Sequence, residues 1–214
     1  MKHFKLTTET KVNAWGVTLF RIQLTIDCKW GKVGDNGGFV EKEENIYGNA
    51  WVYGDAQVSG NACVYGNARV CGDAGVSGNA RVYGDAQVYG DARVSGNARV
   101  CGNAQVYGNA WVYGDAQVCG DACVYGDARV CGDAWVSGDA RVYGDAWGKS
   151  PLQIQGTNHF FCICKNGFIQ IGCKAFEFKY WKDNFEQIGK EQSYTDKQIK
   201  EYGLYIDLAI ALNT

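Results

Sequence analysis

The stretch that decides the fold is RVYGDAQVYGDARVSGNARVCGNAQVYGNAWVYGDAQV, residues Arg81–Val118, in which six letters recur almost unchanged. The pattern V-x-G-[D/N]-A-x runs from Ile46 to Trp147 as 17 consecutive hexads without an insertion or a deletion. A fixed short period of this kind is typical of a protein that stacks copies of one structural unit. We therefore expect a single repetitive body with a different segment at each end.

Within each hexad, the letters A-x-V-x alternate between small apolar and variable residues. A period of two is typical of a β-strand with one buried face, so alanine and valine should point inward and the variable residues outward. The dipeptides Gly-Asp and Gly-Asn end each strand, because glycine adopts positive φ without steric cost. We expect strands of about four residues separated by sharp bends.

Repeated bends close the chain into coils, and each strand can pair in parallel with its copy about 4.8 Å away in the next coil. The outward letters indicate the coil length. Ser59, Ser77 and Ser95 recur at an interval of 18 residues, whereas Tyr89 and Tyr107 form a separate series with the same interval. This segregation favours three hexads per coil. The sequence predicts a mainly β protein, a β-solenoid with 18 residues per coil.

The hexads, for example VSGNARVYGDAQV at Val76–Val88, resemble those of hexapeptide-repeat proteins. The resemblance covers about half of the chain and implies a left-handed, triangular parallel β-helix. The hand comes from the resemblance alone, since parallel strand connections otherwise favour right-handed crossovers.

Composition divides the chain into three parts. Residues 1–45 are expected to form an N-terminal β cap with strands near 5–12 and 16–26, and residues 46–147 the solenoid. Residues 148–214 are expected to form a C-terminal ββαα unit that serves as a cap or assembly module. Its hairpin precedes a helical stripe that begins at Phe178, and Thr195 with Gln198 predicts a capping box for a second helix. Caps are needed because a solenoid exposes unpaired strand edges at both ends.

The variable outward positions provide the candidate binding site. An 18-residue coil places tyrosines above one another, and tyrosine is enriched where proteins meet. The candidate stripe consists of Tyr53, Tyr89, Tyr107, Tyr125, Tyr143, Trp111 and Trp135. Trp51 and Trp147 are also predicted to point outward. The alternative is that the tyrosines only stack on their neighbours and stabilise the solenoid.

The charge of the hexads argues against nucleic acid as a partner. All six bend positions after Asn109 are aspartate, and the hexads contain ten aspartates against six arginines. The end of the rod should therefore be acidic, and a nucleic-acid partner is not expected.

The repeat offers no chemistry for catalysis. Many hexapeptide-repeat proteins are acyltransferases with a histidine base at a subunit boundary, but His3 and His159 are the two histidines here and both lie outside the hexads. No hexad residue suits a general base near neutral pH. We expect no enzyme activity and no cofactor. The alternative is an acyltransferase-like enzyme with its site at a subunit interface.

The cysteines are expected to be reduced thiols, because the repeat already supplies a core. His159, Cys162, Cys164 and Cys173 are weak candidates for zinc ligands, but their spacing favours buried structural thiols instead. Cys101 lies one coil before Cys119, so the two approach disulfide distance, although a reducing compartment opposes that bond.

No run of apolar residues has the length of a membrane helix, and the first residues lack the apolar core of a signal peptide, which favours a cytoplasmic location. The segments LFRI and GDNGGFVEKEENI, the hexads and the tail are similar to hexapeptide-repeat proteins of bacteriophages and prophages. That similarity implies that the cell is a bacterial host, and it favours a homo-oligomeric, non-catalytic binding or scaffold protein. It implies that a host protein of a defence system, or a signalling molecule, is the partner that this protein inhibits.

Overall fold

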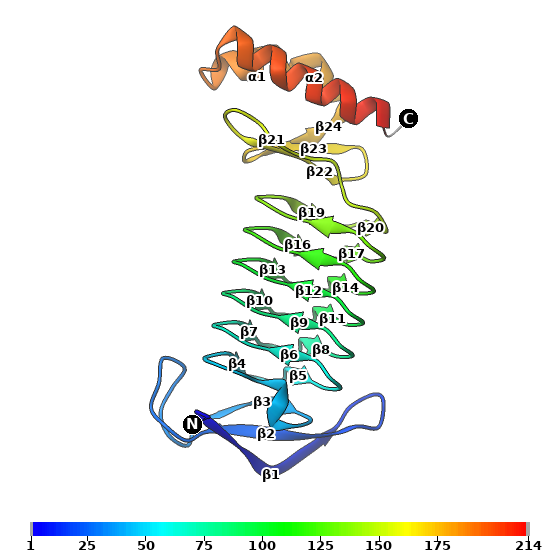
Figure 1. The fold of residues 1–214 in the computed structure, drawn as a ribbon. Coiled ribbons are helices and arrows are strands. Elements are labelled where there is room, and N and C mark those ends of the chain that lie inside the picture. Colours follow the sequence, from blue (N-terminus) through cyan, green and yellow to red (C-terminus); the bar gives the residue numbers. More distant parts are fainter. Residues whose placement is uncertain (1, 213–214) are drawn as a thin grey trace.

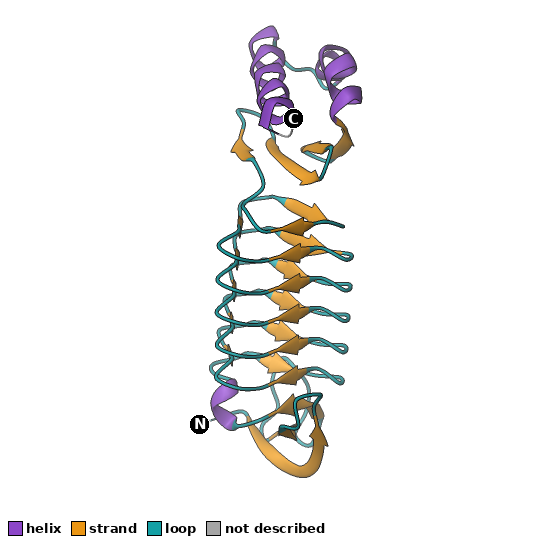
Figure 2. Ribbon diagram, turned by 90° about the vertical axis from the view of Figure 1, so that its right-hand side faces the viewer, coloured by secondary structure: helices purple, strands orange, loops and turns teal. Residues whose placement is uncertain are grey.

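The fold is an elongated rod with a β cap at one end and a helical layer at the other, as Figure 1 shows. The structure is a computed structural model and describes residues 2–212. The rod is a parallel β-solenoid of short strands that stack coil upon coil, with the bends aligned along its edges (Figure 2). The mainly β solenoid with a β cap and a terminal unit containing two helices confirms the fold class predicted from the hexads.

The solenoid has three walls, here called faces I, II and III, and each wall is one stack of parallel strands. Face I contains β4 (Trp51–Val52), β7 (Arg69–Val70), β10 (Gln87–Val88), β13 (Gln105–Val106), β16 (Cys123–Tyr125) and β19 (Arg141–Tyr143). Face II contains β5 (Gln57–Val58), β8 (Gly75–Val76), β11 (Arg93–Val94), β14 (Trp111–Val112), β17 (Arg129–Val130) and β20 (Ala146–Trp147). Face III contains β6 (Cys63–Val64), β9 (Arg81–Val82), β12 (Arg99–Val100), β15 (Gln117–Val118) and β18 (Trp135–Val136).

The register between coils is 18 residues. Val88 pairs with Val70 on one side and with Val106 on the other, in parallel. Hydrogen bonds between coils extend past the assigned strand, as from the Tyr89 amide to the Val106 carbonyl at 3.0 Å. The strands are two or three residues long, which is shorter than the four residues predicted, because the bends begin directly after the pairing residues.

The bends depend on glycine for two reasons. Gly96 has φ of 67°, a conformation that residues with a Cβ rarely adopt. A Cβ on Gly96 would also come within 2.9 Å of the Gly114 amide nitrogen in the next coil. Glycine therefore allows both the sharp bend and the close stacking of one bend on the next.

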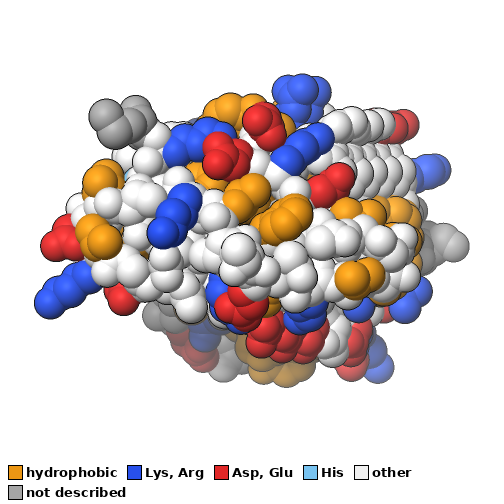
Figure 3. Space-filling model, turned by 90° about the horizontal axis from the view of Figure 1, so that it is seen from below, with side chains coloured by type: hydrophobic (Ala, Val, Ile, Leu, Met, Phe, Trp, Pro, Cys, Tyr) orange, Lys and Arg blue, Asp and Glu red, His pale blue; other side chains and the backbone are white. Residues whose placement is uncertain are grey.

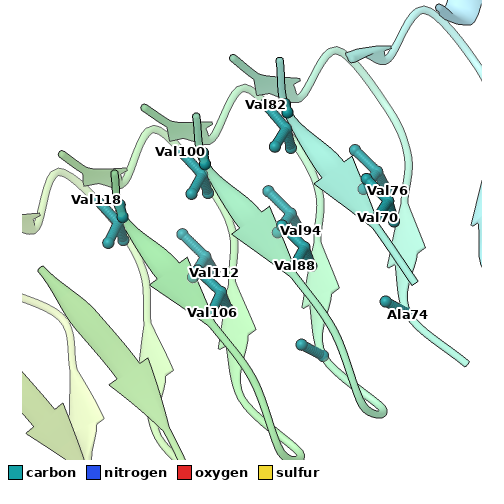
Figure 4. Close-up of a cluster of buried hydrophobic side chains, with 14 of the residues drawn as sticks. Val70, Ala74, Val76, Val82, Val88, Val94, Val100, Val106, Val112 and Val118 are labelled. Carbon is teal, nitrogen blue, oxygen red and sulfur yellow. The ribbon is translucent and has the colours of Figure 1, made fainter. Parts of the chain in front are cut away.

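The core is a narrow column of alanine and valine side chains that fills the solenoid along its length. Val82, Val100 and Val118 stack along face III with their side chains directed into this column (Figure 4), and each is fully buried. The cap closes one end with Phe4 and other apolar residues of the same cluster. Inward-pointing alanine and valine were predicted from the period of two, and the burial pattern confirms them.

The N-terminal cap is a meander that continues face II. Its strands are β1 (Phe4–Val12), β2 (Thr18–Leu24) and β3 (Asn36–Val40), followed by the short 3-10 helix η1 (Glu43–Asn45). The two predicted strands of the cap are present as β1 and β2, which pair antiparallel, whereas β3 pairs in parallel with β5. The turn between β1 and β2 rises beside the first coils (Figure 1).

The C-terminal unit has more strands than the predicted ββαα unit. Its antiparallel sheet contains β21 (Gln153–Gln155), β22 (Phe160–Lys165), β23 (Phe168–Ile171) and β24 (Lys174–Glu177). The helices α1 (Phe178–Glu191) and α2 (Asp196–Leu212) pack on this sheet. The two outer strands were missed because they are short and irregular in sequence. The predicted capping box is confirmed, since the Thr195 amide donates to Gln198 Oε1 at 2.9 Å.

Across residues 2–212, no helix combines the length and apolar character that crossing a membrane requires.

Candidate functional site

The tyrosine column on face I is a run of four stacked rings on the outer wall. Tyr89, Tyr107, Tyr125 and Tyr143 form a continuous stack, with ring centroids 4.9, 5.2 and 5.3 Å apart. The first two pairs are nearly parallel, with interplanar angles of 2° and 6°. The rings lie above one another because each tyrosine follows the central valine of the same strand position in successive coils. The 18-residue interval predicted this column correctly.

The hydroxyl groups of the column remain protonated. Burial raises the pKa of Tyr89, Tyr107 and Tyr125, and burial together with the Cys164 side chain raises the pKa of Tyr143 to about 12. A protonated phenol both donates and accepts a hydrogen bond. The column therefore presents half-buried rings with neutral polar groups, which suits recognition and provides no general base near neutral pH.

Tyr53 belongs to the same column but is separated from the stack. Cys71 occupies the intervening coil, and its side chain together with burial raises the pKa of Tyr53. The continuous part of the predicted stripe is therefore Tyr89–Tyr143. A second stack, Tyr65 on Tyr83 at 4.9 Å, lies on face III.

The predicted tryptophans do not join this stripe. Trp111 is 40% exposed on face II, and Trp135 is 54% exposed on face III. Their separations from the face I positions are not multiples of 18, so they occupy other walls. Trp51 occupies an outward position in register with Arg69, as predicted, but it is buried because the N-terminal cap covers it, with the His3 ring 5.6 Å from its ring. Trp147 is half-buried against the solenoid core.

The bends form polar ladders. Asn97 accepts a hydrogen bond from Asn79 Nδ2 at 3.0 Å and donates to Asp115 Oδ1 at 2.9 Å. Stacked aspartates follow toward the C-terminal end of the solenoid. At the opposite end, side chains of both signs are interspersed over the cap, as Figure 3 shows.

The cysteines differ from the prediction of reduced thiols in one place. Cys101 and Cys119 form a disulfide, with Cα atoms 4.7 Å apart. The bond arises because the two residues are one coil apart in the same column of face III, a spacing within the range that disulfides span. The prediction that both are free thiols is therefore corrected, whereas the predicted proximity is confirmed.

The four residues considered as weak candidates for zinc ligands lie in different environments. Cys162 and Cys164 are buried against the end of the solenoid core, and burial raises the pKa of both thiols, that of Cys162 to about 12. His159 contacts Tyr194 through Nδ1, and Cys173 is exposed. In the described part of the chain, no three His, Cys, Asp or Glu side chains gather as a metal site requires. The two buried thiols thus act in packing.

A groove on face II is a site that the sequence reasoning missed. Its volume is about 350 Å³, and it lies between the β1–β2 turn and the wall formed by β5, β8, β11 and β14. The turn contributes Trp15, and the wall contributes Gly75, Arg93 and Trp111. One signal was available, because Gly75 is the single glycine at the outward position before the central valine. The position of the turn could not be read from the sequence.

Comparison with known proteins supports the repeat and not an activity. Seven stretches match the family model described as YdcK beta solenoid repeat, namely residues 46–60, 56–72, 74–90, 86–102, 104–120, 116–132 and 122–138. These stretches lie within the hexads. A search of the curated proteins finds no match.

Proposed function

We propose that this chain is a non-catalytic binding or scaffold protein whose rigid solenoid captures a protein partner through the tyrosine column of face I. The observation that carries the proposal is the continuous stack from Tyr89 to Tyr143. Each ring is held by its neighbours and by a strand of the wall, so little side-chain freedom remains to be lost on binding. A preorganised surface binds more tightly because this entropic cost is already met.

Residues beside the column supply polar contacts. Gln87, Gln105 and Arg141 occupy the outward positions of the same strands, and the Tyr89 hydroxyl donates to Gln105 Oε1 at 3.2 Å. Aromatic area bordered by arginine and amide groups matches the composition of protein-binding hot spots. Strands β7, β10, β13 and β16 of this wall are paired on both sides, and β22 covers the outer edge of β19, where Cys162 Sγ contacts the Arg141 carbonyl oxygen at 3.6 Å. A partner therefore has to bind side chains and cannot add a strand.

Self-association is a second part of the proposal. Leu204, Leu208 and Leu212 recur at intervals of four along α2, and all three are exposed. Residues four apart lie on one face of a helix, so they form an apolar stripe directed away from the sheet. A homo-oligomer formed through α2 would leave the solenoid walls free.

The biological setting is also proposed. The similarity of the cap and hexads to phage and prophage hexapeptide-repeat proteins supports a phage-encoded protein that acts in the bacterial cytoplasm. A host protein, such as a component of a defence system, is then the partner.

Affinity purification from the host with two matched variants tests the proposal. Tyr89→Ser, Tyr107→Ser and Tyr125→Ser in one chain should abolish capture of a specific partner, because three rings of the stack are lost. Tyr65→Ser with Tyr83→Ser removes the stack on face III and should leave capture unchanged. Mass in solution, measured for all three proteins, separates partner capture from self-association. Equal capture by both variants and the unaltered protein would contradict the proposal.

A further inference from the structure

The groove on face II is independent of the tyrosine column, since the two lie on different walls of the solenoid. Its volume of about 350 Å³ is within the range of small-molecule sites, roughly 300–1,000 Å³. The groove runs along the rod, because its lining residues come from four successive strands of face II. The β1–β2 turn forms the remaining side.

Gly75 opens the floor of this groove. At the same position of the neighbouring coils, face II carries Gln57 and Arg93. The backbone of Gly75 has no positive φ, and a Cβ built on it would meet no atom within 4 Å. Glycine inside a strand is less stable than alanine, because it loses more backbone freedom on folding and has no side chain to pack. Neither local conformation nor packing requires this residue, and its effect is to leave space in the wall.

Two nearly buried polar groups line the groove without a complete set of partners. Ser59 is 7% exposed, and its hydroxyl has no hydrogen bond within residues 2–212. Asn13 is 9% exposed; its Oδ1 accepts from the amides of Trp15 and Val17 at 3.0 Å, whereas its Nδ2 donates to no atom of the described chain. Neither Ser59 Oγ nor Asn13 Nδ2 is fully buried, so both groups are open to the groove and can bond to a ligand that carries hydrogen-bonding atoms.

The charged and aromatic residues narrow the class of ligand. Arg93 lies over the Trp111 ring at 5.4 Å, and it forms no ion pair within residues 2–212. Lys11 also lines the groove, but its Nζ is paired with Asp55 at 3.8 Å, and Asp73 is the lining carboxylate. Arg93 is therefore the lining cation that has no ion pair within residues 2–212. Trp15 is 69% exposed at the other side, so the groove has an indole ring on the turn and another on the wall.

We propose that the face II groove binds a planar aromatic compound that carries a phosphate group, with a nucleoside monophosphate as its representative. Arg93 binds the phosphate, because a guanidinium forms charge-assisted hydrogen bonds with its oxygens. The exposed indole ring of Trp15 stacks on the base, whereas the Trp111 ring already has Arg93 and Arg129 over it at 5.4 and 5.5 Å and borders the site. Ser59, Asn13 and Asp73 remain for the hydroxyl and amine groups of the ligand.

Isothermal titration calorimetry of the full chain with AMP, GMP, CMP and UMP tests this assignment. At least one of the four should bind with a Kd of about 1 mM or lower. Adenosine and inorganic phosphate serve as separate probes of the two halves of the ligand. Each should bind at least about tenfold more weakly than the best nucleotide, because each loses one set of contacts worth 1.4 kcal/mol or more.

A matched pair of substitutions tests the site itself. Gly75→Leu fills the floor and should abolish nucleotide binding, whereas Gln117→Leu places leucine at the corresponding position of face III and should leave the Kd within about twofold. Both variants should keep the melting temperature, since Gly75 has open space around it. Arg93→Gln and Trp15→Ala should each weaken binding by about tenfold or more. Absence of binding by all four nucleotides, inorganic phosphate as strong as the nucleotides, or equal affinity of Gly75→Leu and the unaltered protein would overturn the assignment.

Discussion

Replacing Tyr107 with serine removes two ring stacks at once, because Tyr107 lies between Tyr89 at 4.9 Å and Tyr125 at 5.2 Å. An aromatic pair contributes about 0.5–1.5 kcal/mol beyond the area that it buries, so the free energy of unfolding should fall by about 1–3 kcal/mol. Urea denaturation followed by far-UV circular dichroism measures this loss. The denaturant slope should stay unchanged, since the substitution leaves the surface exposed on unfolding nearly the same.

Two further variants separate stacking from other effects. Tyr47 is exposed and has no ring contact with another described residue, so Tyr47→Ser should change the free energy of unfolding by less than about 0.5 kcal/mol. Tyr107→Phe keeps both stacks and should be equally mild. If Tyr107→Ser lowers the free energy of unfolding by as little as Tyr47→Ser does, the stack does not hold its rings in place. Face I would then not be preorganised for binding.

Three other perturbations test the rod and its cap. Val100→Ala removes two methyl groups from a fully buried position and should cost about 2–3 kcal/mol of unfolding free energy in urea denaturation; a cost below about 0.5 kcal/mol would mean that the interior is loosely packed. Mass spectrometry of peptides from the non-reduced protein should find Cys101 joined to Cys119, and any other pairing would contradict the 18-residue coil. Burial lowers the pKa of His3 below 6.5, so the unfolded chain binds more protons in that range. Stability should be complete above pH 6.5 and fall as the pH drops through the lowered pKa, whereas His3→Phe should lack this loss in the same titration.

The columns of the solenoid were predictable because the hexads leave no freedom of register. Tyr89, Tyr107 and Tyr125 had to stack once three hexads formed a coil, and the proximity of Cys101 and Cys119 followed from the same interval. Whether those two cysteines are joined depends on chemistry that spacing alone does not determine. The prediction of free thiols depended on the expectation that the protein is in a reducing compartment.

The cap and the groove were not predictable for a different reason. The burial of Trp51 depends on where the N-terminal segment, with His3, folds over the first coil. The groove depends on how the turn that carries Trp15 lies beside face II. Both are contacts between a segment with little periodicity and a periodic one, and hydrophobic periodicity says nothing about such contacts. Gly75 was the one local signal, because it interrupts a column of long side chains.

Photocrosslinking tests most directly which wall binds the partner. A photocrosslinking amino acid is placed at an outward position of each face, in separate variants that are expressed in the host. Gln87 lies beside the tyrosine column on face I, Gln117 on face III and Arg129 on face II, so each position is the outward residue of a strand in one of the three walls. We expect a covalent adduct with one host protein from position 87 and none from positions 117 and 129. Adducts of equal yield from all three walls, or from position 117 alone, would contradict the assignment of face I as the surface that binds the partner.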